Sequence, residues 1–245
     1  MKKFQKKERG IEYYQKENLE EKMKKVDLHI HSTASDGKFT PEQIVALAKV
    51  KDIYYISITD HNTIDGVEKG VEEGKKIGVK VIPGIELSTR FKGRQVHILG
   101  YFNKEIYKNK KFIKAITFIQ KKNVYQLKSI FKDKIKVRKG QKRLELSEGI
   151  KFLKIFGAKV VLAHPGKIKR ENLNDIINHD FDGIEAIHPR HNKVEIEYFK
   201  NIAKSKGMFY TAGTDFHNIV KKNVKHGILG ELFLEVKDIN DILKF

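Results

Sequence analysis

Most histidines of this chain fall in or beside short runs of β-branched and aromatic residues. Eight of the ten do so: His29, His31, His61, His97, His164, His188, His191 and His217. In "VDLHIH" two of them are one residue apart, and side chains at i and i+2 of a strand point the same way. His29 and His31 can therefore hold one ion from one face. A lone histidine at a strand end is usually structural, but so many together favour metal binding.

Acidic residues accompany these histidines. Glu86 ends "VIPGIE", Asp60 lies in "ITDHN" and Asp215 in "GTDFH". The two oxygens of Glu86 can bridge two metals. Asp27 and Asp60 are instead candidates to orient the metal ligands through hydrogen bonds, without binding the metal themselves. Asp36, in "SDGKF", has the properties of a turn residue before a glycine. The chain has no cysteine, so any metal must be held by His, Asp or Glu.

Alternating strand and helix patterns can bring these residues to one rim. Seven strand candidates recur: "KVDLHI", "YYISITD", "KVIPGIELS", "QVHILGYF", "KVVLAHP", "DGIEAIH" and "FYTAGTD". The clearest helix starts in "FTPEQIVALAKVKD", with Thr40 as N-cap, Pro41 in the first position and Gln43 completing a capping box. "NTIDGVEKGVEEGKKIG" and "KVEIEYFKNIAKSKG" predict further helices, each ended by a glycine. This alternation predicts a parallel sheet with right-handed crossovers, and seven strands suit a barrel better than an open sheet.

Residues 103–150 depart from this alternation. Between positions 104 and 143, 15 lysines and arginines stand against two acids, a net charge of +13 out of +19 for the whole chain. Apolar residues at helical spacing predict one or two amphipathic helices: Phe112, Ile113, Ile116, Ile119, Val124, Leu127, Ile130 and Phe131. The charge has two interpretations, a solvated lysine-rich surface or a flap that attracts phosphate groups and nucleic acid.

Length and composition suit one large α/β domain. The chain has 245 residues, of which 40% are hydrophobic and 33% charged. It lacks the ~18 consecutive apolar residues of a membrane span and the apolar core of a signal peptide, so we expect a cytoplasmic protein without membrane contact. We interpret residues 1–25 as a charged extension and residues 26–245 as one barrel domain that carries the basic insertion 103–150.

The motifs, in order along the chain, resemble those of the PHP (polymerase and histidinol phosphatase) family. They are "DLHIHSTASDG", "ITDHNTIDG", "GIELS", "HILGYF", "LAHPG", "GIEAIHPRHN" and "GTDFH". The likeness is greatest to nucleoside 3′,5′-bisphosphate phosphatases and 5′→3′ oligoribonucleotide exonucleases, roughly from Val26 to Gly230 outside the insertion. It implies a distorted (β/α)7 TIM-like barrel with two or three divalent metal ions at its rim. Mixed nitrogen and oxygen ligands suit Mn²⁺, Fe²⁺ or Zn²⁺.

The resemblance also implies a ligand set for a trinuclear metal centre. The first metal would take His29, His31, Glu86 and Asp215, the second Glu86, His97 and His164, and the third Asp36, His61 and His217. Asp36 thereby gains a ligand role that its spacing does not suggest. His179 and His226 lie outside the motifs, and we expect both to be structural or exposed.

The activity implied by the resemblance is hydrolysis of a phosphate ester by a hydroxide that the metals generate near neutral pH. With Glu86 as the bridging residue, His188 and His191 of "HPRHN" are expected to contact the phosphate or the leaving group. Arg190 is either a substrate contact or a surface residue. The expected substrates are 3′,5′-bisphosphate nucleotides or the 5′ ends of short oligonucleotides.

Two alternatives share this pattern. One is a small-molecule phosphatase of the histidinol-phosphate type, which would use the same metal centre. The other is a non-catalytic PHP module that binds a nucleic-acid-processing partner, which loss of ligands would indicate. The insertion has no recognisable similarity to the helical inserts of the bisphosphate phosphatases, so no substrate-binding arginine can be assigned in it.

Overall fold

The computed structural model of this chain describes residues 25–219, 226–239 and 242. The predicted extension therefore lies outside the described residues, except for Lys25. The strands are β1 (Lys25–Ile30), β2 (Ile53–Ile58), β3 (Lys80–Phe91), β4 (Arg94–Tyr101), β5 (Lys159–Leu162), β6 (Gly183–Ile187), β7 (Phe209–Ala212) and β8 (Leu234–Glu235). The seven predicted strands are β1 to β7, and the two-residue β8 was not predicted.

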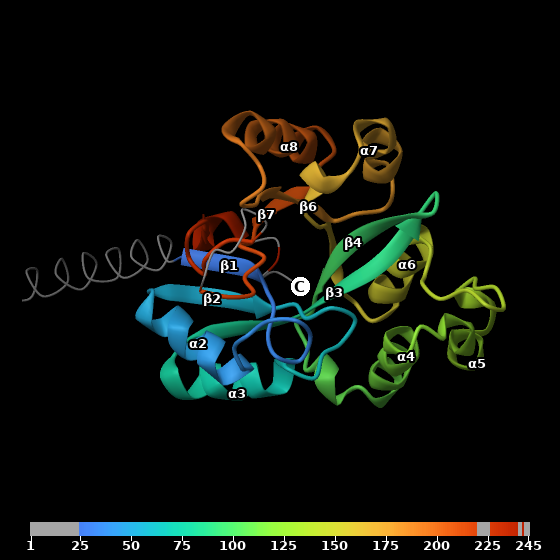
Figure 1. The fold of residues 1–245 in the computed structure, drawn as a ribbon, viewed down its shortest axis with the longest axis horizontal. Coiled ribbons are helices and arrows are strands. Elements are labelled where there is room, and N and C mark those ends of the chain that lie inside the picture. Colours follow the sequence, from blue (N-terminus) through green and yellow to red (C-terminus); the bar gives the residue numbers. More distant parts are fainter. Residues whose placement is uncertain (1–24, 220–225, 240–241, 243–245) are drawn as a thin grey trace, which may run out of the picture.

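The strands form one curved sheet in the order β7-β6-β5-β4-β3-β2-β1-β8. The sheet bends until β7 lies beside β1, as Figure 1 shows, which makes a nearly closed barrel. A bridge between Ile30 and Phe216 continues this contact beyond the strand ends. The predicted TIM-like α/β barrel is confirmed.

The prediction of an all-parallel sheet is wrong at β4. This strand runs antiparallel to both β3 and β5. The reason is the link between β3 and β4, which is only Lys92 and Gly93, with φ angles of 47° and 77°. A parallel connection needs about a dozen residues to cross over, whereas a two-residue loop with positive φ makes a hairpin.

The helices lie on the outside of the barrel (Figure 1). They are α2 (Pro41–Val50), α3 (Val67–Ile77), α4 (Lys110–Gln120), α5 (Lys128–Phe131), α6 (Leu146–Ile155), α7 (Arg170–Ile177) and α8 (Lys193–Ser205). Short 3₁₀ turns cover Ile106–Lys108, Val124–Leu127, Lys132–Lys134, Pro165–Lys167 and Val236–Ile239. The predicted capping box of Thr40 and Gln43 is confirmed at α2. Left-handed glycines follow α3 and α8, at Gly78 and Gly207.

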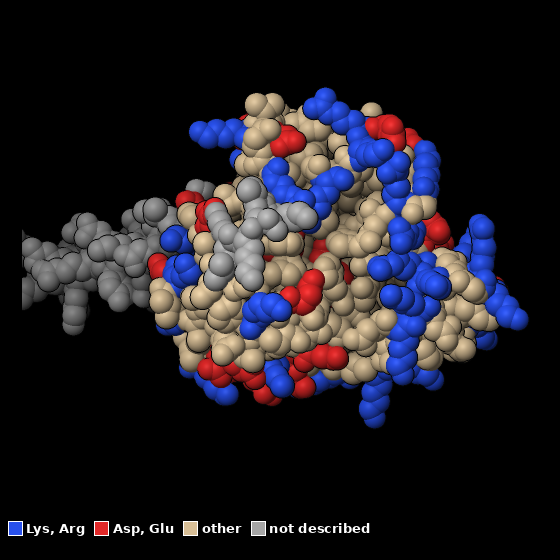
Figure 2. Space-filling view, in the orientation of Figure 1, with Lys and Arg blue, Asp and Glu red and all other residues tan. Residues whose placement is uncertain are grey.

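The insertion forms an outer wall of α4, α5 and 3₁₀ turns. Its apolar face packs on the barrel helices: the ring of Phe112 stacks on that of Phe152 in α6 at 5.6 Å between centroids. Of the predicted apolar positions, only Ile113 is exposed, at 38%, and Ile130 is half-buried. The lysines of the insertion are exposed, and Figure 2 shows a column of positive charge on this side of a central hollow that has acidic groups in it.

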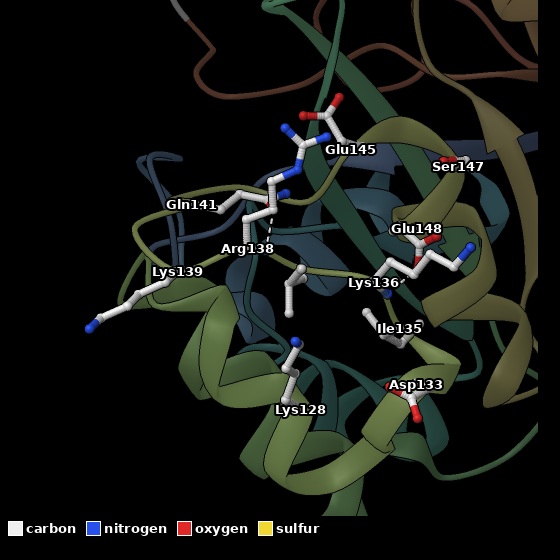
Figure 3. Close-up of a pocket in the computed structure, with 11 residues that line it drawn as sticks. Lys128, Asp133, Ile135, Lys136, Arg138, Lys139, Gln141, Glu145, Ser147 and Glu148 are labelled. Atoms are coloured by element: carbon white, nitrogen blue, oxygen red, sulfur yellow. Dashed lines mark hydrogen bonds between the residues drawn. The ribbon is translucent and has the colours of Figure 1, made fainter.

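The insertion runs the height of the barrel. It starts after Tyr101, which pairs with Lys159, the first residue of β5. It ends near the rim, where the Arg90 N–H donates to the Leu144 carbonyl at 2.9 Å. Near that end lies a cavity of about 550 Å³, lined by both bases and acids, among them Lys128, Arg138 and Glu145 (Figure 3).

Candidate metal centre

The predicted ligands lie together at the carboxyl ends of the parallel strands and in the hairpin above them. His29 and His31 end β1, His61 follows β2, and His164 follows β5. Glu86 lies in β3, His97 in β4, and Asp215 with His217 after β7. Because β4 is antiparallel, His97 reaches this rim from the first half of its strand, opposite Ser88. The alternating fold thus brings side chains from distant segments to one place.

Glu86 is at the centre of this cluster and is fully buried. Its Oε2 lies 3.2 Å from His29 Nε2, 3.2 Å from His31 Nε2 and 3.0 Å from His61 Nδ1. Its Oε1 lies 2.8 Å from His97 Nδ1 and 3.0 Å from His164 Nε2. Each oxygen thus faces its own set of imidazoles, which is the arrangement that a carboxylate needs to bridge two cations.

Asp215 gathers a second set of groups. Its Oδ1 lies 3.2 Å from His31 Nε2 and 3.6 Å from His29 Nε2. Its Oδ2 faces His188 Nε2 at 3.4 Å, Lys167 Nζ at 3.1 Å and His226 Nδ1 at 3.2 Å. The backbone of Asp215 has a φ of 52°, in the left-handed region. Side chains rarely tolerate that region, and such strain is commonly found at functional sites.

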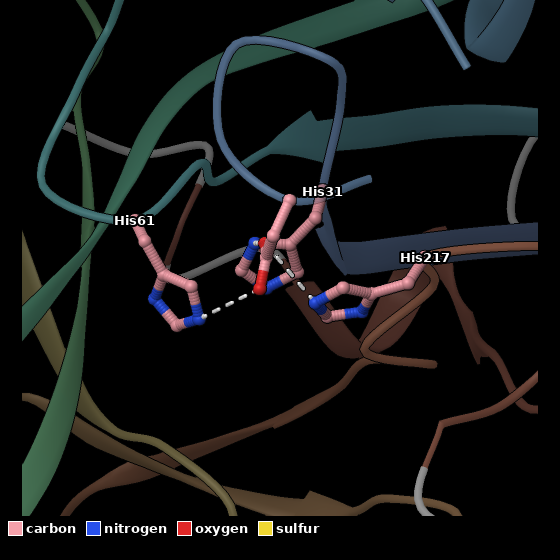
Figure 4. Close-up of side chains that lie close together, drawn as sticks. His31, His61 and His217 are labelled. Carbon is pink, nitrogen blue, oxygen red and sulfur yellow. Dashed lines mark ion pairs between the residues drawn. The ribbon is translucent and has the colours of Figure 1, made fainter. Parts of the chain in front are cut away.

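Asp36 joins the cluster from the solvent side, with 55% of its side chain exposed. Its Oδ1 lies 3.2 Å from His217 Nε2, and its Oδ2 lies 3.9 Å from His61 Nε2, the two pairs marked in Figure 4. The loop before Asp36 folds back so tightly that a Cβ at Gly37 would clash with the His31 carbonyl. Glycine is therefore required at position 37 for Asp36 to reach the imidazoles.

Within the described residues, four groups of ligand atoms lie close enough together to hold a cation. They are His29, His31, Glu86 and Asp215; His61, Glu86 and His97; His31, Asp36, His61 and His217; and Asp215, His217 and His226. The first group coincides with the set expected for the first metal. The second contains His61 where His164 was expected, and the third adds His31 to the expected set.

The buried polar atoms of this cluster fit divalent cations. His31 Nδ1, His61 Nδ1 and Glu86 Oε2 are buried and make no hydrogen bond within the described part of the chain. Leaving such an atom unsatisfied costs about 1–3 kcal/mol. His61 and Glu86 approach to 3.0 Å without hydrogen bonding, as expected where a cation rather than a proton joins two groups. Imidazole nitrogens with carboxylate oxygens suit Mn²⁺, Fe²⁺ and Zn²⁺.

The charges of the cluster stabilise one another. Burial alone would raise the pKa of Glu86, but the nearby His97, His29 and His61 hold it well below its usual value. Burial alone would lower the pKa of His31, but the adjacent carboxylates of Asp215 and Glu86 raise it to about 9. Burial lowers the pKa of His164 to about 3. The carboxylates are therefore ionised at neutral pH, and metal binding would displace a proton from His31.

Asp27 and Asp60 are fully buried but orient loops rather than imidazoles. Asp27 accepts hydrogen bonds from the N–H and hydroxyl of Thr214, at 3.0 and 2.7 Å, and so holds the residue before Asp215. Asp60 accepts from the Ser32 N–H at 2.8 Å and from the Ser35 hydroxyl at 2.6 Å. It thereby fixes the loop that carries Asp36.

Glu185 contacts the predicted ligands directly and was missed by the sequence analysis. His29 Nδ1 lies 2.9 Å from Glu185 Oε1, and the His164 N–H donates to Oε2 at 2.6 Å. A carboxylate behind a ligating imidazole fixes its tautomer and orientation. The available signal was the acid in "GIEAIH", since a charge within an otherwise apolar strand needs a buried partner.

The "HPRHN" segment places its two histidines differently. His188 is fully buried, and its Nδ1 accepts the Arg190 N–H at 3.1 Å while Nε2 faces Asp215. His191 Nδ1 donates to the Ala186 carbonyl at 2.9 Å, and its Nε2 accepts the Gly166 N–H at 3.0 Å. Both nitrogens of His191 are thus used within the protein, so the expected phosphate contact falls to His188 alone.

The two histidines outside the motifs also differ. His179 lies beyond α7 and donates to carbonyls of that helix, which agrees with the expected structural role. His226 is half-exposed, but the centroid of its ring lies 4.1 Å from that of the His217 ring, and its Nδ1 faces Asp215. His226 therefore belongs to the cluster, contrary to the expectation from the motifs.

Comparison with known proteins agrees with this geometry. Residues 27–210 match the PHP domain. The chain belongs to the PHP domain family. It is a member of a phosphoesterase family, and the expected resemblance is confirmed. Within the described residues, every helix is too short or too polar to cross a membrane.

Two curated relatives of this chain differ in how much of their length is matched. A 5′-3′ exoribonuclease of Haemophilus influenzae is 42% identical over 77 residues, which is 31% of this chain and 28% of the relative. A phosphoribosyl 1,2-cyclic phosphate 1,2-diphosphodiesterase of Eggerthella lenta is 24% identical over 244 residues, which cover 78% of this chain and 93% of the relative. The chain therefore spans under a third of the first relative and nearly all of the second.

One solved structure has the same fold. It belongs to a Bifidobacterium adolescentis protein provisionally classed as a metal-dependent phosphoesterase. The two chains superpose with a TM-score of 0.71 at 20% identity, over 89% of this chain and 95% of the other. At this identity the likeness establishes the barrel and no more.

Proposed function

We propose that this PHP protein is a metal-dependent phosphoesterase that hydrolyses phosphate esters of nucleotides. The substrates are 3′,5′-bisphosphate nucleotides or the 5′ ends of short oligonucleotides. The main support is the buried Glu86 carboxylate, whose two oxygens face separate sets of imidazoles. Such a site suits two or three cations held close together, and paired cations clamp the attacking and leaving oxygens of a phosphoryl group.

The cations would be held by the nine ligand candidates named above: His29, His31, Asp36, His61, Glu86, His97, His164, Asp215 and His217. When bound, divalent cations supply a hydroxide near neutral pH and neutralise charge on the phosphoryl oxygens. Around them Asp27, Asp60 and Glu185 hold the loops and rings in place. The protein's task is to keep these groups fixed before substrate binds.

His188 is placed to donate a proton or a hydrogen bond to the substrate. Its Nδ1 accepts the Arg190 backbone N–H, so the neutral ring carries its proton on Nε2. That nitrogen faces Asp215 at 3.4 Å, inside the cluster. Lys167, whose Nζ lies 3.1 Å from Asp215, adds a positive charge beside it. Together they suit a phosphoryl oxygen or an ester leaving oxygen.

The surface around the site is suited to polyanions. Lysines and arginines of the hairpin and the insertion stand along one side of the central hollow (Figure 2). Positive charge beside a cleft raises the local concentration of phosphorylated ligands and speeds their binding. This charge favours nucleotides that carry several phosphates over esters that carry one.

Turnover of a substrate panel tests the proposal. Protein stripped by a chelator and reloaded with Mn²⁺ would receive adenosine 3′,5′-bisphosphate, a 5′-phosphorylated RNA trimer, histidinol phosphate and phosphoribosyl 1,2-cyclic phosphate. We expect the fastest release of product from one of the two nucleotide substrates. Preference for either of the other two would replace the substrate assignment, and absence of turnover on all four would overturn the enzymatic one.

A further inference from the structure

A second cavity lies beside the metal cluster, between the β3–β4 hairpin and α7. It has a volume of about 280 Å³ and is lined by Phe91, Arg94, Gln95, Val96, Lys167, Ile168, Lys169, Asn172 and Ile176. The hairpin and α7 lie side by side in Figure 1, and an ion pair of 2.7 Å between Lys92 and Asp175 joins them. The hairpin and α7, which bound the cavity, are therefore in direct contact through this ion pair.

Two lining residues connect this cavity to the metal cluster. The Gln95 side chain contacts His97 Nε2. Lys167 pairs with Asp215 at 3.1 Å. The cavity thus begins one side chain away from the groups that would hold the cations. A ligand with its phosphate at the cluster can place its next group here.

The walls combine three kinds of chemistry. Apolar side chains of Phe91, Val96, Ile168 and Ile176 form the sides. Arg94 and Lys169 add positive charge, and none of the described residues that line the cavity is acidic. Asn172 is only 8% exposed, and its side-chain amide makes no hydrogen bond to another described residue. Its donor and acceptor groups are therefore open to a ligand in the cavity.

We infer that this cavity binds the base of the nucleotide whose phosphate lies at the metal cluster. This inference rests on the proposed function and names the part of the substrate that the cavity recognises. A base is flat and apolar on its faces, which suits walls of phenylalanine and isoleucine. Its edge carries donors and acceptors, which an asparagine amide can match with both of its groups. The volume of about 280 Å³ lies just below the ~300–1,000 Å³ of drug-sized ligand pockets, which suits one base with part of its sugar.

Binding of adenosine 5′-monophosphate and ribose 5-phosphate, measured by calorimetry on the full chain, tests this inference. We expect Asn172→Ala to weaken adenosine monophosphate binding about 3- to 10-fold, the effect of one lost hydrogen bond. Ribose 5-phosphate, which lacks the base, should bind equally to both proteins. Asn174→Ala is the matched control, because Asn174 is exposed on the same helix and does not line the cavity.

A second variant tests the positive charge that lines the cavity. Arg94→Ala should weaken both ligands or the nucleotide alone, whereas Arg170→Ala, outside the cavity, should weaken neither. Equal losses for both ligands in Asn172→Ala, or no loss for the nucleotide, would overturn the assignment. Because these measurements need no turnover, they are independent of the substrate panel, whose failure would count against the proposed function instead.

Discussion

His29 Nδ1 lies 2.9 Å from the Glu185 carboxylate across the barrel, and both side chains are fully buried. The contact leaves Nε2 of His29 facing Glu86 and Asp215. Burial alone would lower the pKa of His29, but Glu185, Glu86 and Asp215 raise it well above its usual value. Glu185 thus fixes which nitrogen of His29 is offered to a cation, without itself reaching one.

Glu185→Gln tests this role, because it keeps the shape of the side chain and removes its charge. We expect Mn²⁺ affinity to fall about 10- to 100-fold, as is typical when the group behind a ligating histidine is changed. Metal titration followed by calorimetry measures it. Glu171→Gln, on the exposed side of α7, is the control. Unchanged metal affinity in Glu185→Gln would exclude a positioning role.

Glu86 and His31 variants test the ligand assignment. Glu86→Ala and His31→Ala should each reduce turnover by at least about 100-fold, since both remove donors shared between cation positions. The metal content per chain, measured by elemental mass spectrometry, should fall as well. Circular dichroism should show that both variants remain folded. The exposed Glu197→Gln is the control. Substantial activity in both variants would contradict the assignment.

Metal binding should depend on pH with a defined sign. Burial would lower the pKa of His31, but the adjacent carboxylates of Asp215 and Glu86 raise it to about 9 in the metal-free protein. A raised pKa stabilises the folded metal-free protein below about pH 6.5, and this contribution is lost as the pH rises through 9. Between these values metal must displace the proton, so affinity should rise with pH. Proton release on adding Mn²⁺ in weak buffer measures it; absence of release at pH 7.5 would contradict this titration.

Gly213→Ala should disturb the cluster from behind. The added Cβ would clash with the Cβ of His29 and with Glu185 Oε1. Overpacking of this kind costs about 1–3 kcal/mol, so we expect a lower midpoint of urea unfolding and weaker metal binding together. Gly70→Ala in helix α3 is the comparison, because its added Cβ would crowd only the flexible end of the Ile58 side chain. Equal stability of the two variants would show that this part of the barrel can relax.

The basic insertion should contribute to binding through charge. Lys139→Gln with Lys142→Gln removes two exposed positive charges, and we expect KM for a bisphosphate nucleotide to rise a few-fold at low salt. The difference should shrink at high salt, because salt screens exposed charges. Lys193→Gln with Lys204→Gln on α8 is the control. A KM that does not change with ionic strength would favour the other interpretation, in which the insertion is a solvated lysine-rich surface.

Much of this site could be predicted because residues at the ends of different strands meet at one rim of the barrel. A histidine at a strand end can be recognised in the sequence, and the barrel fold then brings several such histidines together. Glu185 and His226 were missed for opposite reasons. Glu185 lies within a strand rather than after one. His226 reaches the cluster through a contact with Asp215 that no spacing encodes. The direction of β4 was missed because strand periodicity is the same in both directions.

The direction of β4 has a consequence for how such an enzyme can diversify. Because β4 runs away from the rim, the chain leaves it at the far end of the barrel and returns to Arg90 only after the insertion. Every predicted cation ligand lies outside that excursion. The insertion can therefore be lengthened, shortened or recharged in evolution while the hydrolytic machinery stays intact. The positive charge of the insertion and the predicted cation ligands therefore come from separate stretches of the chain.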